Sequence, residues 1–194
     1  NITISPTSGL GAVTINSSGG SGSSNTVTFA TSSYGSFYDT GSYTYPSTTT
    51  VYSASMGSTQ ISNGVYVSGS DKTKIYFTNA GVYNVQLGLQ FSNTNTGNAS
   101  DNIDVWFRQG NGTGSAYDVS SSNYIVTIPN NKGGINGYAV GSWNYYISAS
   151  ANDYVQICLT PNTTTLGLTA VAAQSNPTIP STPSLVVTAN RVDT

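Results

Sequence analysis

The stretch FTNAGVYNVQLGLQF, residues 77–91, determines the expected fold, because it contains the longest regular alternation in the chain. Its alternate positions are apolar at Tyr83, Val85, Leu87, Leu89 and Phe91, and polar or small at Asn84, Gln86, Gly88 and Gln90. A period of two belongs to a β-strand with one face on a core and the other on water or a partner. The stretch therefore predicts a strand over Val82–Phe91 that begins directly after an Ala-Gly turn.

Ten further runs have the composition and length of strands. They are Ser36–Asp39, Thr50–Ala54, Gly64–Val67, Lys74–Phe77, Asn102–Gln109, Tyr124–Ile128, Tyr138–Ala149, Tyr154–Thr160, Leu166–Ala173 and Ser184–Val192. Segments rich in Gly, Asn, Pro and Ser separate them, and no helical period persists over a useful length. Many short strands with turn signals at this spacing predict an all-β sandwich or jelly roll.

Alternation also predicts which side chains face the core. The inward sets are Ile103, Val105 and Phe107; Trp143, Tyr145 and Ile147; and Leu185, Val187 and Ala189. Trp106, Arg108 and Tyr146 lie beside these sets on the other strand faces. Such mixed faces suit a subunit interface, and they are equally compatible with ordinary solvent-facing positions.

Residues 1–33 differ from the rest of the chain. Two short alternating runs, Ile2/Ile4 and Val13/Ile15, precede the Gly/Ser-rich segment 17–26. We expect residues 1–33 to form a short N-terminal β arm, or the end of a preceding β module, followed by a flexible linker. Two strands alone are marginal in water, so the arm is expected to dock on another surface, and residues 34–194 are expected to form the main domain.

The composition excludes several classes of function. Charged residues make up 6% of the 194 residues, against about 25% in an ordinary soluble domain. The net charge of −2 gives no basic surface for nucleic acid, and no apolar run reaches the ~20 residues of a membrane span. Aromatic residues reach 11%, which argues against disorder and indicates a folded chain whose surface relies on hydroxyl and amide groups.

The residues needed for common enzyme chemistry are missing from the sequence. The chain has no His, so a His-based triad or zinc site has no basis. Its seven acidic residues are all Asp and are scattered, and Asp101 and Asp104 are expected on opposite faces of one strand. Asp101 and Asn102 offer oxygen ligands, but their spacing matches no calcium loop. The lone Cys158 is expected to pack inside the fold. We therefore expect no catalytic residue, metal or cofactor.

Several motifs resemble the TNF-like jelly roll, including the complement globular heads. Gly81, Val82 and Tyr83 match the turn that opens one family strand, and Asn152–Val155 match another with Asn in place of Gly. The resemblance is stronger to a phage and virus branch, through YGSFYDT (34–40), VWFRQGNG (105–112), VTIPNNKGG (126–134), SWNYYI (142–147), DYVQI (153–157) and VVTANRV (186–192). It covers about residues 34–194, and the long segment GNGTGSAYDVSSSNY departs from it.

The resemblance implies a homotrimer whose aromatic strand faces pack around a threefold axis. The interface candidates are Tyr83, Trp106, Arg108, Trp143, Tyr146 and Tyr154. The resemblance also implies a non-enzymatic virion structural protein, either a capsid decoration or cement protein or a fibre head. Its expected location is the virion surface, outside the cell. Residues 1–33 would then anchor the trimer to a capsid or fibre protein.

Two other functions remain open from the sequence. One is the receptor-binding head of a phage tail fibre that recognises a host glycan or protein through loops 93–101, 110–123 and 161–165. Its candidate ligand residues are Asn95, Asn98, Tyr117, Asp118 and Tyr124. The other is a cellular surface adhesin or spore-coat head.

Overall fold

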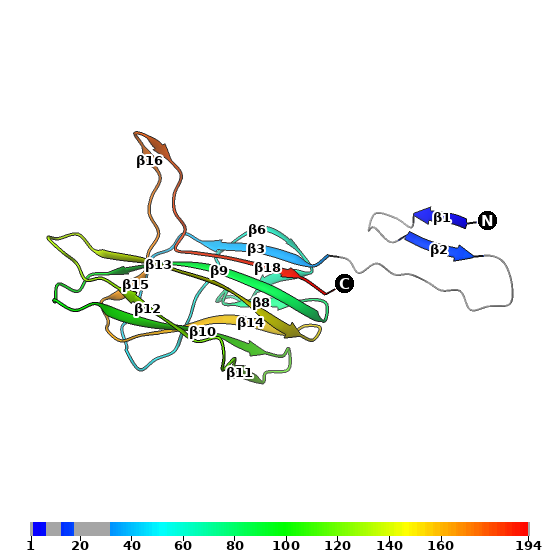
Figure 1. The fold of residues 1–194 in the computed structure, drawn as a ribbon, viewed down its shortest axis with the longest axis horizontal. Coiled ribbons are helices and arrows are strands. Elements are labelled where there is room, and N and C mark those ends of the chain that lie inside the picture. Colours follow the sequence, from blue (N-terminus) through cyan, green and yellow to red (C-terminus); the bar gives the residue numbers. More distant parts are fainter. Residues whose placement is uncertain (1, 7–12, 18–31, 194) are drawn as a thin grey trace.

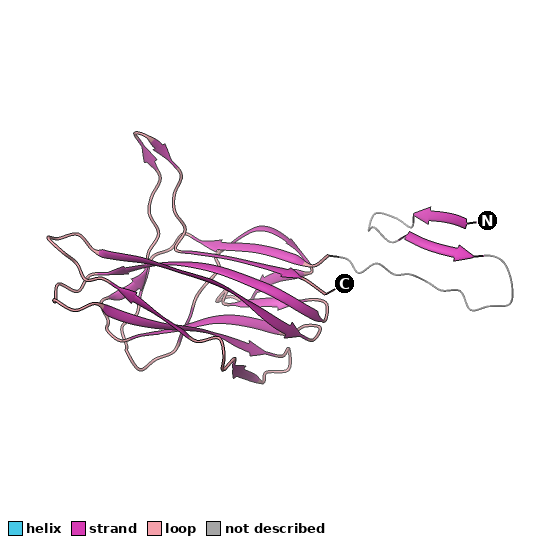
Figure 2. Ribbon diagram, viewed as in Figure 1, coloured by secondary structure: helices cyan, strands magenta, loops and turns pink. Residues whose placement is uncertain are grey.

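The structure is a computed structural model that describes residues 2–6, 13–17 and 32–193, with side chains in the last of these ranges. Every regular element in the described part of the chain is a β-strand (Figure 2). The strands are β1 (Ile2–Pro6), β2 (Val13–Ser17), β3 (Tyr34–Asp39), β4 (Tyr43–Thr44), β5 (Tyr52–Ser53), β6 (Ser58–Asn63), β7 (Val65–Ser68), β8 (Lys74–Phe77), β9 (Gly81–Asn93), β10 (Asp101–Gly110), β11 (Ala116–Asp118), β12 (Tyr124–Ile128), β13 (Gly137–Ala149), β14 (Tyr154–Pro161), β15 (Leu166–Leu168), β16 (Gln174–Ser175), β17 (Thr178–Ile179) and β18 (Leu185–Arg191). The all-β prediction is confirmed.

Two seven-stranded antiparallel sheets pack face to face as a sandwich (Figure 1). The first, here called the β9 sheet, has the order β4-β15-β9-β18-β3-β6, with β13 on the other side of β9. The second, the β10 sheet, has the order β11-β10-β14-β8-β7, with β12 also on β10 and β5 also on β14. Strands distant in sequence are neighbours in both sheets, as in a jelly roll.

The β9 strand organises its sheet as the opening alternation predicts. It pairs over its whole length with β13, from Gly81 opposite Ala149 to Asn93 opposite Gly137. Its other side pairs with β18 and then with β15. All five apolar residues of the alternation are buried, so the predicted core face of β9 is confirmed.

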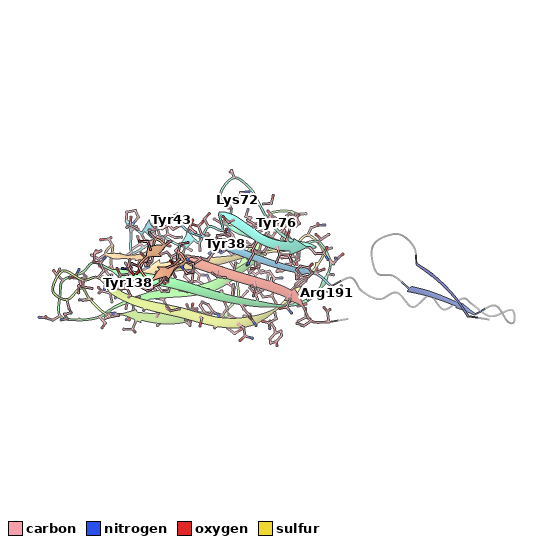
Figure 3. All side chains as sticks on the ribbon, turned by 90° about the horizontal axis from the view of Figure 1, so that it is seen from above. Tyr38, Tyr43, Lys72, Tyr76, Tyr138 and Arg191 are labelled. Atoms are coloured by element: carbon pink, nitrogen blue, oxygen red, sulfur yellow. The ribbon has the colours of Figure 1, made fainter. Side chains whose placement is uncertain are left out.

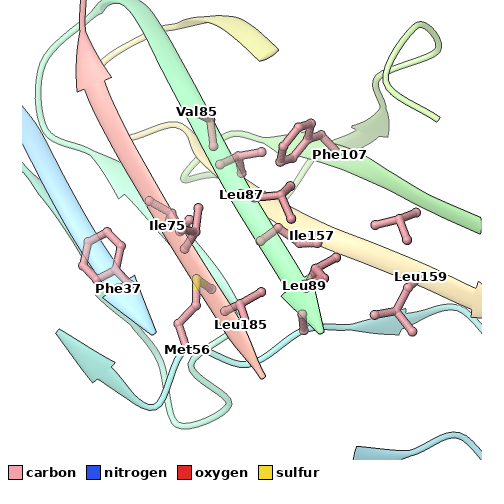
Figure 4. Close-up of a cluster of buried hydrophobic side chains, with 14 of the residues drawn as sticks. Phe37, Met56, Ile75, Val85, Leu87, Leu89, Phe107, Ile157, Leu159 and Leu185 are labelled. Carbon is pink, nitrogen blue, oxygen red and sulfur yellow. The ribbon is translucent and has the colours of Figure 1, made fainter. Parts of the chain in front are cut away.

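The core lies between the two sheets (Figure 4). The β9 sheet contributes Val85, Leu87, Leu89 and Leu185, and the β10 sheet contributes Ile75, Phe107, Ile157 and Leu159. The inward sets predicted for β10 and β18 are fully or almost fully buried. In β13, Ile147 is buried, while Trp143 and Tyr145 are partly buried against the same core, so the predicted direction of all three is confirmed.

Each of the eleven predicted strands overlaps a strand of the structure. Three are shorter than predicted: Thr50–Ala54 reduces to β5, Leu166–Ala173 reduces to β15, and Ser184–Val192 loses one residue at each end in β18. No pattern in the sequence marks β4, β6, β11, β16 and β17, because these strands bury almost no apolar face. The strand β6, for example, pairs with β3 at the sheet edge while five of its six residues are exposed.

Near the N-terminus, β1 and β2 pair with each other as an antiparallel two-stranded sheet. The two predicted alternating runs are therefore strands. The predicted Gly/Ser linker falls almost entirely outside the described residues, and docking of the arm stays a prediction.

A second small hairpin, β16–β17, rises away from the sandwich (Figure 1). Its base is joined by the bridge between Val171 and Thr182.

Candidate self-association surface

The outer face of the β9 sheet contains no charged side chain across four neighbouring strands. We call this surface the uncharged face. Its residues are Tyr34, Ser36 and Tyr38 of β3; Val186, Thr188 and Asn190 of β18; Val82, Asn84, Gln86, Gly88, Gln90 and Ser92 of β9; and Tyr138, Val140, Ser142, Asn144, Tyr146 and Ser148 of β13. Soluble surfaces normally carry many charges, but only 6% of the residues in this chain are charged, so a surface of this size would be expected to carry about one. The exposed apolar side chains on this face therefore distinguish it more than the absence of charge does.

Strand register arranges these residues in rows across the sheet. One row runs from Ser142 through Gly88 and Val186 to Tyr38. Another runs from Tyr146 through Asn84 and Asn190 to Tyr34. Paired residues on antiparallel strands project to the same side of the sheet, so the rows form one continuous surface.

Several large apolar side chains of this surface are exposed to solvent. The exposed fractions are 52% for Tyr138, 70% for Val140, 59% for Tyr146 and 40% for Val186. A hollow of about 330 Å³ lies beside Val140 and is also lined by Val171, at the base of the β16–β17 hairpin. Apolar side chains grouped on an uncharged surface are typical of a surface that another protein covers.

The centre of the uncharged face is open. A Cβ atom added to Gly88 would meet no atom within 4 Å. Hollows of about 350 and 290 Å³ lie on either side of this strand, against β13 and β18 respectively. Close by, the buried side-chain oxygen Oδ1 of Asn84 accepts no hydrogen bond from the described residues.

The charged residues of these four strands are Asp39 of β3, which is buried on the inner side, and Arg191 at the end of β18. Arg191 and Tyr138 mark opposite ends of β9 (Figure 3), where they lie beside Tyr83 and Ser92 respectively. The Nε of Arg191 lies 2.9 Å from Oδ1 of Asp193, and this hydrogen bond lowers the pKa of the Asp193 carboxyl. The ion pair therefore borders the uncharged face without entering it.

Of the six interface candidates from the sequence, Tyr146 alone presents its side chain on the uncharged face. Tyr83 lies fully inside the core, where its hydroxyl donates to the carbonyl oxygen of Asn79 at 2.7 Å. Trp143 points inward from β13 and packs on Phe107.

The other three interface candidates lie on the outer side of the β10 sheet. Arg108 donates through Nε to Oδ1 of Asp118 at 2.7 Å. Tyr154 packs against Tyr76, and the ammonium of Lys74 lies 4.9 Å from the centre of its ring. The structure therefore does not bring the six candidates together on one surface.

The five candidate ligand residues are also dispersed. Asn95 and Asn98 lie in the loop before β10, where the amide of Asn95 donates to Asp101 at 2.8 Å. Tyr117 lies in β11, beyond the C-terminal end of β10. The side chain of Asp118 is already paired with Arg108. Tyr124 packs on Trp143, and burial raises the pKa of its phenol.

The residues that sequence reasoning missed are Tyr138, Val140, Val186 and Gly88. Alternation along β9, β13 and β18 already marks them as outward. Their grouping depends on the order and register of the three strands, which single strands do not reveal.

Elsewhere in the described chain, chemically reactive groups are sparse. The described residues contain no cluster of three or more His, Cys, Asp or Glu side chains suited to hold a metal ion. Cys158 is fully buried, and burial raises the pKa of its thiol. The described residues also provide no helix of the length and apolarity required to span a bilayer.

Together, the strand order and the two packed sheets define a TNF-like jelly-roll sandwich. The crystal structure of murine APRIL, a TNF-family jelly roll, is similar to this chain with a TM-score of 0.53 and 8% identity, and the match covers 83% of this chain and 99% of that one. At this identity the likeness establishes the fold alone. No protein-family model and no curated protein matches the sequence.

Proposed function

We propose that this chain is a non-enzymatic structural protein that forms a homotrimer and buries its uncharged face at the subunit contacts. The observation that supports this most is the group of exposed apolar side chains, Tyr138, Val140, Tyr146 and Val186, on four adjacent strands whose outer face carries no charge. A second copy of the chain is a suitable partner, because it brings the same amide, hydroxyl and aromatic groups and no charge that would need a counterion.

The physical argument rests on the cost of exposing this surface. Burying the apolar side chains contributes roughly 25 cal/mol for each Å² removed from water. The TNF-like fold supports a trimer as the form of assembly by analogy of architecture.

We further propose that the trimer is carried on a virion surface, as a capsid decoration or cement protein or as a fibre head. The support for this finer statement is the order of motifs from YGSFYDT to VVTANRV. In this proposal residues 1–33 anchor the domain of residues 34–194 to a capsid or fibre protein.

The trimer is tested by multi-angle light scattering of the purified chain at micromolar concentration. A trimer has three times the 20.1 kDa mass of one chain. A monomeric mass across the micromolar range would contradict the proposed assembly.

The particle location requires a separate experiment, cryo-electron microscopy of the particle that carries the chain. Many trimers spread over the shell would support decoration, and a few copies at a fibre tip would support a fibre head. Absence of the chain from particles would contradict both versions of the virion proposal.

A receptor-binding head is the second candidate function. A groove on the other outer face of the sandwich, beside Trp106, favours it.

A further inference from the structure

A groove of about 390 Å³ lies on the outer side of the β10 sheet, opposite the uncharged face. Its lining includes Asp104, Trp106, Asp118, Val119, Ser120 and Asn123. These residues come from β10 and from the segment 118–123, which passes alongside that strand. The groove lies on the opposite side of the sandwich from the uncharged face, so burying that face in subunit contacts would not by itself cover the groove.

Trp106 is held in a fixed orientation within the groove. Its indole Nε1 donates to Oδ1 of Asp118 at 2.8 Å. Asp118 is in turn held by Arg108, whose Nε and Nη2 donate to its two carboxylate oxygens at 2.7 and 3.2 Å. A ring fixed before binding loses little conformational entropy when a ligand packs on it.

Next to the ring, polar groups remain free to bind a ligand. Asn123 donates through Nδ2 to Oδ1 of Asp104 at 3.3 Å, which orients both side chains. Hydrogen bonds among the described residues leave Oδ2 of Asp104, Oδ1 of Asn123 and the hydroxyl of Ser120 without a partner. The groove therefore offers mainly acceptors, which suit a ligand rich in O–H donors.

The charge of the groove selects against anions. Arg108 offsets the charge of Asp118, while Asp104 has no cation within ion-pairing distance among the described residues. One uncompensated carboxylate disfavours phosphate, sulfate and acidic sugars. A neutral ligand with hydroxyl groups fits both the charge and the acceptors.

We propose that this groove binds a neutral pyranose unit of a glycan, with the sugar's C–H face on the Trp106 ring. The C–H groups of a sugar face are weakly positive and pack on the negative face of an aromatic ring. The sugar hydroxyls then donate to Asp104 and Asn123. An apolar platform with a few convergent polar groups is the usual composition of a small-molecule site.

Saturation-transfer difference NMR at millimolar ligand tests this directly. The probes are the methyl glycosides of β-D-glucopyranose, β-D-galactopyranose and α-D-mannopyranose, with N-acetylneuraminic acid as the acidic sugar. We expect saturation of at least one neutral glycoside and none of the acidic sugar. The expected loss of affinity in Trp106→Ala is about tenfold, the effect of one aromatic contact.

Matched variants distinguish binding in this groove from binding elsewhere on the chain. Asp104→Asn keeps the shape of the groove and is expected to weaken binding severalfold, so it serves if Trp106→Ala fails to fold. Tyr66→Ala removes an exposed ring of β7, which does not line the groove, and it is expected to bind as the unmodified chain does. Gly88→Lys, designed to separate the trimer, is also expected to retain glycoside binding.

Three results would overturn the proposal. They are no transfer to any neutral glycoside, transfer unaffected by both Trp106→Ala and Asp104→Asn, and transfer to tetramethylammonium with none to the glycosides. None of these results bears on the trimer, which light scattering tests separately.

Discussion

The two outer faces of the sandwich differ in their charged residues. The outer face of the β9 sheet has no charged residue on β3, β9, β13 or β18, since Arg191 pairs with the inward Tyr83 and projects to the other side of the sheet. The outer face of the β10 sheet has Lys74, Asp104 and Arg108, and its aromatic rings are engaged by neighbouring side chains. The proposed trimer would cover the first face and leave the second open to solvent or to the proposed ligand.

The largest effect is expected from a lysine at Gly88, the open centre of the uncharged face. Gly88→Lys should dissociate the trimer, because an unpaired ammonium buried at each subunit contact costs several kcal/mol. The fold should persist, since a Cβ there meets no atom within 4 Å. Light scattering gives the mass, and circular dichroism checks the fold.

The matched control is Thr127→Lys, an exposed position on the β10 sheet opposite Asn102. It adds the same charge to the other face and should leave the trimer intact. Equal dissociation by both lysines would mean that charge in general, rather than its place on the uncharged face, opposes assembly.

A second comparison is between the loss of stability on truncating a buried residue and the loss on truncating an exposed one. Leu89→Ala should lower the free energy of unfolding by about 2–5 kcal/mol, because Leu89 is fully buried between the sheets. Val140→Ala should change the stability of the monomeric Gly88→Lys background by less than about 0.5 kcal/mol, because Val140 is 70% exposed. Denaturant unfolding measures both, and similar losses would show that the two faces are not distinguished as the fold indicates.

A smaller effect is expected from the Arg108–Asp118 pair. Its hydrogen bonds lower the pKa of the Asp118 carboxyl, so it adds stability above the ordinary Asp pKa of about 3.9 and loses it as pH falls through the lower folded value. Asp118→Asn should cost at most about 1 kcal/mol at neutral pH, since both partners are partly exposed.

The measurement is urea unfolding of both proteins over a series of pH values. The difference between them should disappear at acid pH. A difference that is constant with pH would exclude the ion pair as its cause.

The smallest expected effect is on the reactivity of the Cys158 thiol toward a thiol reagent. The thiol is fully buried on β14, and burial raises its pKa, so little thiolate forms at neutral pH. A thiol reagent such as 5,5′-dithiobis(2-nitrobenzoic acid) should react slowly with the folded chain and fully with the chain in guanidinium chloride. Rapid reaction of the folded chain would show that the β10 sheet opens at this strand.

The sequence predicted much of the fold because the core-facing residues alternate clearly. FTNAGVYNVQLGLQF marks β9 and its buried face, and the inward sets of β10, β13 and β18 follow the same rule. The edge strand β6 was missed because STQISN has no apolar face to signal a strand. Its place in the sheet comes instead from its antiparallel pairing with β3.

The candidate sites were less predictable, because each depends on contacts between distant residues. Tyr83 looked suitable for an interface, yet the alternation that includes it also directs it into the core. Trp106 and Asp118 meet through the pairing of β10 with β11, which the turn-rich segment between them does not specify. The uncharged face forms only when β13, β9, β18 and β3 are placed side by side.

Hydroxyl-radical footprinting of the assembled protein and of the Gly88→Lys variant tests the central claim most directly. Tyr138 and Tyr146 lie on the uncharged face, while Tyr66 and Tyr117 belong to the β10 sheet, and all four are exposed in the single chain. We predict that assembly protects Tyr138 and Tyr146 from oxidation and leaves Tyr66 and Tyr117 as reactive as in the variant. Protection of Tyr66 and Tyr117 with full reactivity of Tyr138 and Tyr146 would contradict the account, because it would place the subunit contact on the other face.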